Sequence, residues 1–348
     1  MAIAQWYYWR GFHRHSGDPF ILQPASWAPL TAFAASLSIV WWLATGRFST
    51  AVVDRPKARS LHETAVPRTG GLGLHGGVLI ALGIIAPDLP AALWLALAIM
   101  LLVSFIDDLR GLAPAWRLAA HIGACGLFVS GALGGQELAA IAAVAILCAW
   151  MANLYNFMDG SDGLAGGMAV AGFSFYGIAA WTSGNPDFAL ANFSIAAAAA
   201  GFLVFNFHPA RIFLGDVGSV PLGFLAAALG ILGYLQGNWT WWYPPLVFAP
   251  FIVDASVTLA RRTLRMEKVW QAHRDHYYQR LVQMGWGHRK TALAEYGLMA
   301  ASGAAALAGL RLPASSQWAM LVAAALVYAA MIVLVEVRWR NFQRQGRS

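Results

Sequence analysis

Acidic residues of this chain gather in a few short segments between long apolar stretches. Nine of the sixteen Asp and Glu residues fall in five such segments: Asp54, Glu63, Asp107, Asp108, Asp159, Asp162, Asp216, Glu267 and Asp275. Carboxylates are ligands that hard divalent cations prefer in proteins, and such cations commonly bridge substrate phosphates. The pattern therefore predicts a metal and phosphate site at a membrane surface.

The most specific segment reads NLYNFMDGSDGLAGG and runs from residue 153 to 167. Four oxygen-bearing side chains recur in it at spacings of three: Asn153, Asn156, Asp159 and Asp162. They would share one face of a helix, and Gly160 and Gly163 would let the backbone break and approach a ligand. Oxygen ligands without Cys or clustered His suit Mg²⁺ or Mn²⁺. A plain Asp-Gly turn is the alternative, but it would not need both asparagines.

Asp107 and Asp108 form an adjacent pair where an apolar stretch ends. Successive residues on a helix point about 100° apart, so one carboxylate can face a cleft as base or metal ligand while the other supports it. Two neighbouring carboxylates at a low-dielectric boundary also tend to raise one pKa, which suits a general base. The alternative is a helix end that only emerges into solvent.

Two further segments supply candidates. Gly215-Asp216-Val217-Gly218-Ser219 places a carboxylate at the start of an apolar stretch, where it would complete a metal site or simply cap a helix. The basic loop from 54 to 71 suits phosphate contact, with Arg59, His62 and Arg68 as candidates, although basic loops are also topology signals.

Asp254 lies inside an apolar stretch, about two turns before Arg261 and Arg262. It could pair with these arginines or reach the site, and the sequence leaves both open.

Composition sets the fold class. The chain has 348 residues, of which 59% are hydrophobic and 11% charged, far from the roughly 25% charged residues of soluble domains. We expect one all-α polytopic membrane domain over residues 1–348, with about eleven transmembrane helices, or ten if one is re-entrant. The expected spans are 27–46, 72–87, 90–106, 116–133, 138–154, 164–182, 188–206, 219–236, 241–260, 291–310 and 316–337.

Lys and Arg predict the orientation, because basic residues in short loops stay in the cytoplasm. With eleven spans, 20 of the 23 basic residues fall on one side, together with the acidic segments and a loop from 261 to 290. The N-terminus would then lie outside, and the C-terminus and site in the cytoplasm. The net charge of +7 indicates a face toward anionic lipids and substrates rather than toward nucleic acid.

Together these segments resemble the polyprenyl-phosphate N-acetylhexosamine-1-phosphate transferases, a family that includes phospho-MurNAc-pentapeptide translocase and the enzymes that start O-antigen and common-antigen synthesis. The resemblance runs from about Asp54 to Lys290. Its marks are the 54–71 loop, the Asp107-Asp108 pair, the 153–167 segment, the 215–219 segment and His273-Arg274-Asp275-His276.

The resemblance implies a reaction in the bacterial inner membrane: a sugar 1-phosphate passes from a UDP-N-acetylhexosamine to undecaprenyl phosphate, and UMP is released. It implies Mg²⁺, or Mn²⁺, held by Asp216 and Asn156. Asp107 or Asp108 would act as base on the lipid phosphate, with a covalent intermediate through Asp108 as the alternative. The remaining implied site residues lie near the nucleotide sugar and phosphates: Asp159, His276, Asn153, Asp162, Arg59, His62, Arg68 and Arg274. Membrane lipids are further partners, and a homodimer would fit the family.

Departures from the family pattern bear on specificity. Tyr277, Tyr278 and Gln279 follow His276 where relatives often carry two more histidines. This favours the O-antigen initiating branch over the peptidoglycan translocase.

A transporter or flippase remains the rival class, and it predicts charges near the middle of the membrane and inverted repeats. Apart from Asp254 the chain has neither feature. A CDP-alcohol phosphotransferase expects Ala-Arg after its first Asp-Gly, whereas Leu164-Ala165-Gly166 follows the Asp-Gly repeat in this chain.

Overall fold

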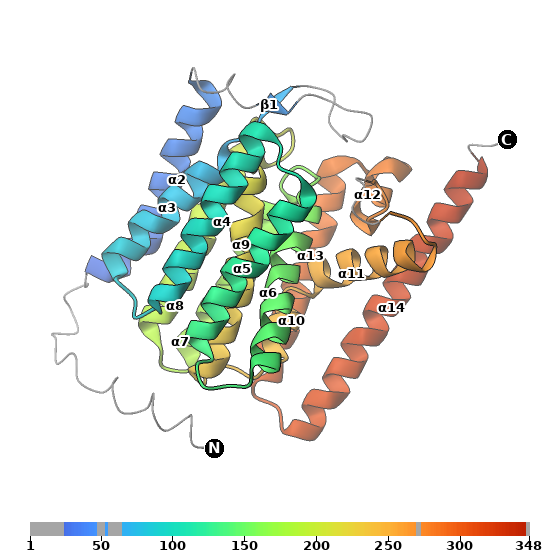
Figure 1. Cartoon of the computed structure of the whole chain (residues 1–348). Helices are drawn as coiled ribbons and strands as arrows, with labels where there is room; N and C mark the ends of the chain where they lie inside the picture. Colours follow the sequence, from blue (N-terminus) through green and yellow to red (C-terminus); the bar gives the residue numbers. More distant parts are fainter. Residues whose placement is uncertain (1–23, 47–52, 55–64, 269–272, 346–348) are drawn as a thin grey trace.

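The computed structural model describes residues 24–46, 53–54, 65–268 and 273–345, and they are mostly helical (Figure 1). Helices occur at all eleven positions of the expected spans. They are α2 (Ala28–Thr45), α3 (Gly70–Ile85), α4 (Ala91–Arg110), α5 (Pro114–Ala132), α6 (Leu138–Phe157), α7 (Leu164–Thr182), α8 (Pro186–Asn206), α9 (Asp216–Leu235), the pair α10 (Tyr243–Val247) and α11 (Ala249–Leu264), α13 (Gly287–Gly309) and α14 (Ala314–Gln345).

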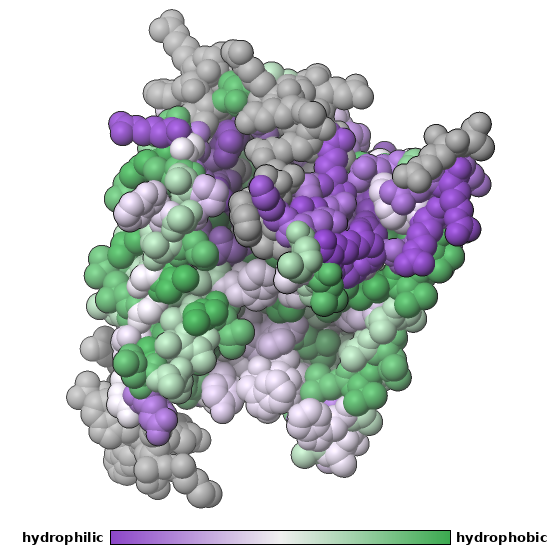
Figure 2. Space-filling model, turned by 45° about the vertical axis from the view of Figure 1, so that its right-hand side comes forward, coloured by the Kyte–Doolittle hydropathy of each residue, from purple (hydrophilic) through white to green (hydrophobic). Residues whose placement is uncertain are grey.

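Seven of the described helices are long and apolar enough to cross a membrane, and α3 is a shorter apolar helix. The prediction of an all-α polytopic membrane protein is therefore confirmed in its architecture. Hydrophobic residues cover the sides of the molecule, whereas hydrophilic residues gather at the end where α14 finishes (Figure 2). The exact number of crossings stays a prediction.

The span expected at 241–260 is broken into two helices. Pro244 and Pro245 lie at the start of α10, and Pro250 lies in the first turn of α11. Proline lacks a backbone N–H and is accepted at helix starts but not in helix interiors, so this sequence begins a helix twice instead of continuing one. As a result α11 runs across the direction of the other long helices (Figure 1).

Two short strands and a short helical segment add to the long helices. β1 (Val53–Asp54) pairs antiparallel with β2 (Val66–Pro67), with Asp54 opposite Val66. In the loop expected at 261–290, the described part after the end of α11 holds the short helix α12 (Tyr277–Leu281) and the π-helical turn η3 (Val282–Trp286).

α9 is the central helix of the bundle and packs against α4 and α6. Small residues allow this close contact: a Cβ added at Gly223 would lie 2.6 Å from the Met151 carbonyl oxygen of α6. At the start of α9, Gly218 meets Gly71 of α3, where a Cβ on Gly71 would lie 2.4 Å from Gly218 Cα. Small residues at crossings are how membrane helices approach closely. The packing fixes where α9 begins, and with it Asp216.

Hydrogen bonds tie the loops at this end to one another. Phe213 donates its N–H to the Pro67 carbonyl at 2.7 Å, and Gly70 donates to the Phe213 carbonyl at 2.9 Å. Asn206 accepts from the Gly163 N–H at 3.0 Å and donates to the Ile212 carbonyl at 2.9 Å. The segments that carry the predicted site residues therefore share one connected network.

The contact between Gly71 and Gly218 can be tested by substitution. Gly71→Ala forces Cβ against backbone atoms that cannot rotate away, so we expect a loss of about 1–3 kcal/mol of stability, as for an overpacked core. The measurement is the thermal unfolding midpoint in detergent. Gly83→Ala is the control, because an added Cβ on that helical glycine of α3 meets nothing within 4 Å. Equal midpoints for the two variants would contradict the contact.

Candidate active site

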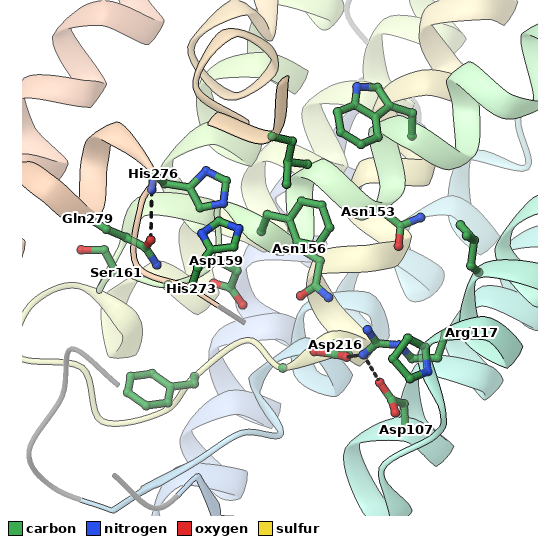
Figure 3. Close-up of a pocket in the computed structure, with 18 of the residues that line it drawn as sticks. Asp107, Arg117, Asn153, Asn156, Asp159, Ser161, Asp216, His273, His276 and Gln279 are labelled. Atoms are coloured by element: carbon green, nitrogen blue, oxygen red, sulfur yellow. Dashed lines mark hydrogen bonds and ion pairs between the residues drawn. The ribbon is translucent and has the colours of Figure 1, made fainter. Parts of the chain in front are cut away.

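The loops at the hydrophilic end enclose a cavity of about 1220 Å³, close to the ends of α4 and α6 and the start of α9 (Figure 3). Eight of the predicted site residues line it: Arg68, Asp107, Asn153, Asn156, Asp159, Asp162, Asp216 and His276. Asp108 and Arg274 are not among the lining residues. Arg59 and His62 lie outside the described residues.

Asp107 and Asp216 converge on one cation. Asp107 Oδ2 accepts from Arg117 Nη1 at 2.6 Å, and the same nitrogen lies 3.1 Å from Asp216 Oδ2 (Figure 3). Asp107 Oδ1 accepts from the Leu112 N–H at 2.5 Å. Two carboxylates that share one positive nitrogen define a place where positive charge is favoured.

Sequence reasoning missed Arg117, which it used only as one of the basic residues on the cytoplasmic side. The available signal was its position in the first turn of α5, soon after the Asp107-Asp108 pair. A cation that close to two carboxylates at a helix boundary is a candidate partner for them.

Asp108 has a different environment from Asp107. Its carboxylate pairs with Arg68 and accepts the N–H groups of Asp216 at 3.1 Å and Val217 at 2.9 Å. Only 2% of the side chain is exposed. Asp108 therefore caps the start of α9, and Asp216, which was considered as a cap, instead turns its carboxylate toward Arg117.

Asp159 follows the end of α6 and faces the cavity half-buried. Within the described part of the chain its carboxylate accepts no hydrogen bond and makes no ion pair. Burial raises the pKa of Asp159 well above its usual range, and the negative charges of Asp216 and Asp108 raise that pKa further. The cavity is thus lined by a carboxyl group without a hydrogen-bonding partner among the described residues, and the charge of Arg68 offsets only part of the rise in its pKa.

The two asparagines lie on the same wall, on α6. Asn153 donates to the Ala149 carbonyl at 2.7 Å, and its side chain is also hydrogen-bonded to His121. Asn156 Oδ1 accepts from the Ser219 hydroxyl at 2.9 Å. Since a carbonyl oxygen has two lone pairs, Asn156 keeps one for a cation or a substrate donor.

Asp162 is held by histidines that sequence reasoning did not single out. Its Oδ2 lies 2.7 Å from His208 Nδ1, and its Oδ1 lies 3.8 Å from His288 Nδ1. The two imidazole rings stack with centroids 5.5 Å apart. The Ser161 hydroxyl is 2.9 Å from His288 Nδ1. Because Asp162, His208 and His288 come from distant segments, only the folded chain reveals this group.

The loop that carries His276 forms the opposite wall. Burial, together with the nearby His276 and Arg262, lowers the pKa of His273 to about 4, so this ring is neutral at pH 7.

Asp254 pairs with neither of the arginines considered for it: Arg261 contacts Glu336, and Arg262 contacts Asp275. Its carboxylate lies 3.1 Å from His276 Nδ1 instead.

Comparisons with known proteins show the family of the chain. The family model described as Glycosyl transferase family 4 matches residues 90–234. A probable undecaprenyl-phosphate N-acetylglucosaminyl 1-phosphate transferase of Bacillus subtilis is 29% identical over 262 residues, which cover 70% of this chain and 73% of the relative. A decaprenyl-phosphate N-acetylglucosaminephosphotransferase of Mycolicibacterium smegmatis is 27% identical over 366 residues, covering 90% of this chain and 88% of the relative.

A phospho-N-acetylmuramoyl-pentapeptide-transferase of Symbiobacterium thermophilum is 31% identical over 242 residues, which cover 59% of this chain and 72% of that protein. The chain therefore belongs to Glycosyl transferase family 4. It is a multi-pass membrane protein of this family of polyprenyl-phosphate sugar-1-phosphate transferases, and the resemblance seen in its motifs is confirmed.

The raised pKa of Asp159 predicts a dependence of stability on pH. A carboxyl group whose native pKa is raised destabilises the fold once it ionises, so stability falls as pH rises from the ordinary pKa of 3.8 toward the native value. Asp159→Asn removes this loss. We expect its thermal unfolding midpoint, measured in detergent without substrate, to exceed that of the wild type by an amount that grows above about pH 4.

Asp187→Asn serves as the control, because Asp187 is exposed in the first turn of α8, whereas the cavity residue Asn206 is at the last turn of the same helix. Midpoint differences that do not change with pH would show that the Asp159 carboxylate is compensated.

Proposed function

We propose that the protein transfers an N-acetylhexosamine 1-phosphate from a UDP-sugar to undecaprenyl phosphate, releases UMP and so starts a lipid-linked glycan such as O-antigen. The observation that carries this proposal is the Asp107–Arg117–Asp216 cluster in a cavity that is polar at one side and apolar at the other. UDP-N-acetylglucosamine is the first donor to consider, because the relatives in B. subtilis and M. smegmatis are named for N-acetylglucosamine.

Phosphoryl transfer depends mainly on positioning and on neutralisation of charge. An oxygen of the lipid phosphate forms a bond to the phosphorus that carries the sugar, while the bond from that phosphorus to the bridging oxygen breaks and UMP leaves. Asp107 is the better placed of the two adjacent carboxylates to take a proton from the lipid phosphate, because it lines the cavity. Direct attack is favoured over a covalent intermediate, since Asp108 is buried and engaged by three donors.

The donor set suits a divalent cation. Asp107 Oδ2 and Asp216 Oδ2 lie within 2.6 and 3.1 Å of one cationic nitrogen, and Asn156 offers a neutral oxygen nearby in the cavity. In the described ranges no group of three or more His, Cys, Asp or Glu residues could hold a metal ion alone. This fits Mg²⁺ or Mn²⁺, which take one or two carboxylates and fill the remaining positions from phosphates and water. Held by Asp216 and Asn156, such an ion would neutralise charge on the diphosphate and on the leaving UMP.

The other lining residues divide into donors and acceptors for the nucleotide sugar. Arg68 and His276 supply positive or N–H groups for phosphate oxygens, whereas Asn153, Asp159 and Asp162 supply oxygens for hydroxyl and amide donors. Arg59, His62 and Arg274 stay predicted phosphate contacts of the surrounding loops.

Part of the cavity lining is apolar and is called the apolar groove below. It is formed by residues of α5, α6 and α11: Leu118, Ile122, Ile146, Trp150, Leu259 and Ala260. Ile122 and Ile146 are 39% and 57% exposed, on the surface that faces lipid in a membrane. A polyprenyl chain would fit along these residues with its phosphate at Asp107.

The same arrangement supports the predicted orientation in the bacterial inner membrane. α2 begins and α14 ends at opposite ends of the bundle, as an odd number of crossings requires (Figure 1). The end of α4 and the start of α9, which carry the cavity residues Asp107 and Asp216, lie toward the end where α14 finishes. Eleven crossings would place that end in the cytoplasm, where UDP-sugars are made. The rival transporter expects its charges at mid-membrane, whereas the Asp107, Asp159 and Asp216 carboxylates lie where helices end or begin. A homodimer remains an expectation from the family.

The transferase assay tests the proposal directly. Purified protein with undecaprenyl phosphate, Mg²⁺ and UDP-N-acetylglucosamine, or another UDP-N-acetylhexosamine, is expected to release UMP. Asp216→Asn is expected to lower the rate by at least about a hundredfold, as loss of one preorganised electrostatic group does. Asp88→Asn, an exposed carboxylate outside the cavity, is the matched control. Folded protein that releases no UMP with any donor would favour the carrier instead.

The apolar groove predicts a selective effect on the lipid substrate. Ile122→Trp adds bulk where the polyprenyl chain would lie, so we expect the KM for undecaprenyl phosphate to rise about tenfold, equivalent to about 1.4 kcal/mol. The KM for the UDP-sugar should change little. Ile84→Trp makes the same substitution at a residue of α3 that is 41% exposed and outside the cavity. An equal rise in both KM values would argue against this path for the lipid.

A further inference from the structure

Asp254 is a buried carboxylate that meets four donors from one loop and one helix turn. Its Oδ1 accepts from the Tyr277 N–H at 2.9 Å and the Thr258 hydroxyl at 3.2 Å, and lies 3.1 Å from His276 Nδ1. Its Oδ2 accepts from the Tyr278 N–H at 2.9 Å. Three of the four donors belong to the His276 loop.

These contacts determine the orientation of the His276 ring. Because a carboxylate only accepts, Nδ1 must carry the hydrogen, and Nε2 is the nitrogen left for the cavity that His276 lines. The ring is also stacked with Phe157 and His273, with centroid distances of 6.3 and 4.9 Å. The stacking restricts tilt, and Asp254 decides which nitrogen faces the cavity.

The loop needs such an anchor from outside. α12 has five residues, too few for a stable isolated helix, because the first turn costs more entropy than its hydrogen bond returns. Two of its first N–H groups, those of Tyr277 and Tyr278, are bonded to Asp254 rather than left unsatisfied. Asp254 therefore holds both the backbone and the imidazole at the same point.

We infer that Asp254 is a positioning residue of the transferase, which acts through His276: by accepting from Nδ1–H it directs Nε2 into the cavity, where Nε2–H of the doubly protonated ring donates to a phosphate oxygen of the bound nucleotide sugar. This inference rests on the proposed function. The arrangement parallels sites where a carboxylate holds the far nitrogen of a metal-bound histidine, and where loss of the carboxylate costs about 10- to 100-fold in affinity or activity.

A double-mutant cycle on UMP release tests the inference, with Asp254→Ala, His276→Ala and the double variant. In the wild-type background we expect Asp254→Ala to lower kcat/KM by about 10- to 100-fold. In the His276→Ala background the same change should have almost no further effect, because the ring that it positions is gone. Equal losses in both backgrounds would overturn the inference, since a purely structural residue costs the same with or without His276.

A second variant and a second measurement test the inference if Asp254→Ala folds poorly or if no UMP release is detected. Asp254→Asn retains the shape and one acceptor oxygen, so it should show a smaller effect with the same dependence on His276. Nitrogen-15 NMR of histidine-labelled protein, assigned with His276→Ala, should show hydrogen on Nδ1 of His276 in the wild type and a loss of this preference in Asp254→Ala. Unchanged signals would overturn the inference. This readout needs no turnover, so it separates failure of the inference from failure of the proposed function. Asp187→Asn is the control in both experiments.

Discussion

The positions of the site residues depend on the hydrogen bonds between the Asp108 carboxylate and the first N–H groups of α9. They connect the end of α4 to the start of the central helix, and Arg68 joins the same carboxylate from the loop before α3. A helix start carries partial positive charge and unsatisfied donors, so a buried carboxylate is stable there. With Asp108 held in this way, its neighbour Asp107 points into the cavity, and Asp216 lies across from it.

Charge balance explains the rest of the site. Arg68 and Arg117 compensate Asp107, Asp108 and Asp216. Asp159 has no ion-pair partner among the described residues, and burial together with the charges of Asp216 and Asp108 raises its pKa. A raised pKa means that the ionised carboxylate lowers the stability of the fold. Such a group is typical of a functional site.

Much of the architecture follows from apolar length alone. The helices occur where stretches of about 20 apolar residues predict them, and the motifs at their ends line one cavity. Other features depend on pairing between distant segments, which periodicity cannot show. Asp107 and Asp108 were equivalent in the sequence, and only the position of the α9 N-terminus separates them. Arg117 and His288 looked like ordinary loop residues, and the role of Asp254 depends on a loop about 20 residues further along the chain. The span expected at 241–260 was continuous, and its break before Pro250 and the direction of α11 were not predicted.

That crossing helix has a consequence for how the two substrates meet. α11 lies across the direction of the other long helices, and its residues Leu259 and Ala260 line the cavity together with apolar residues of α5 and α6. A lipid that enters there never leaves the plane of the membrane and arrives by diffusion in two dimensions, whereas a nucleotide arrives from the aqueous volume. The rate then depends on the mole fraction of the lipid substrate among membrane lipids and on the molar concentration of the nucleotide in water. Dilution of the lipid substrate with other membrane lipids would lower the reaction rate even when the soluble donor is saturating.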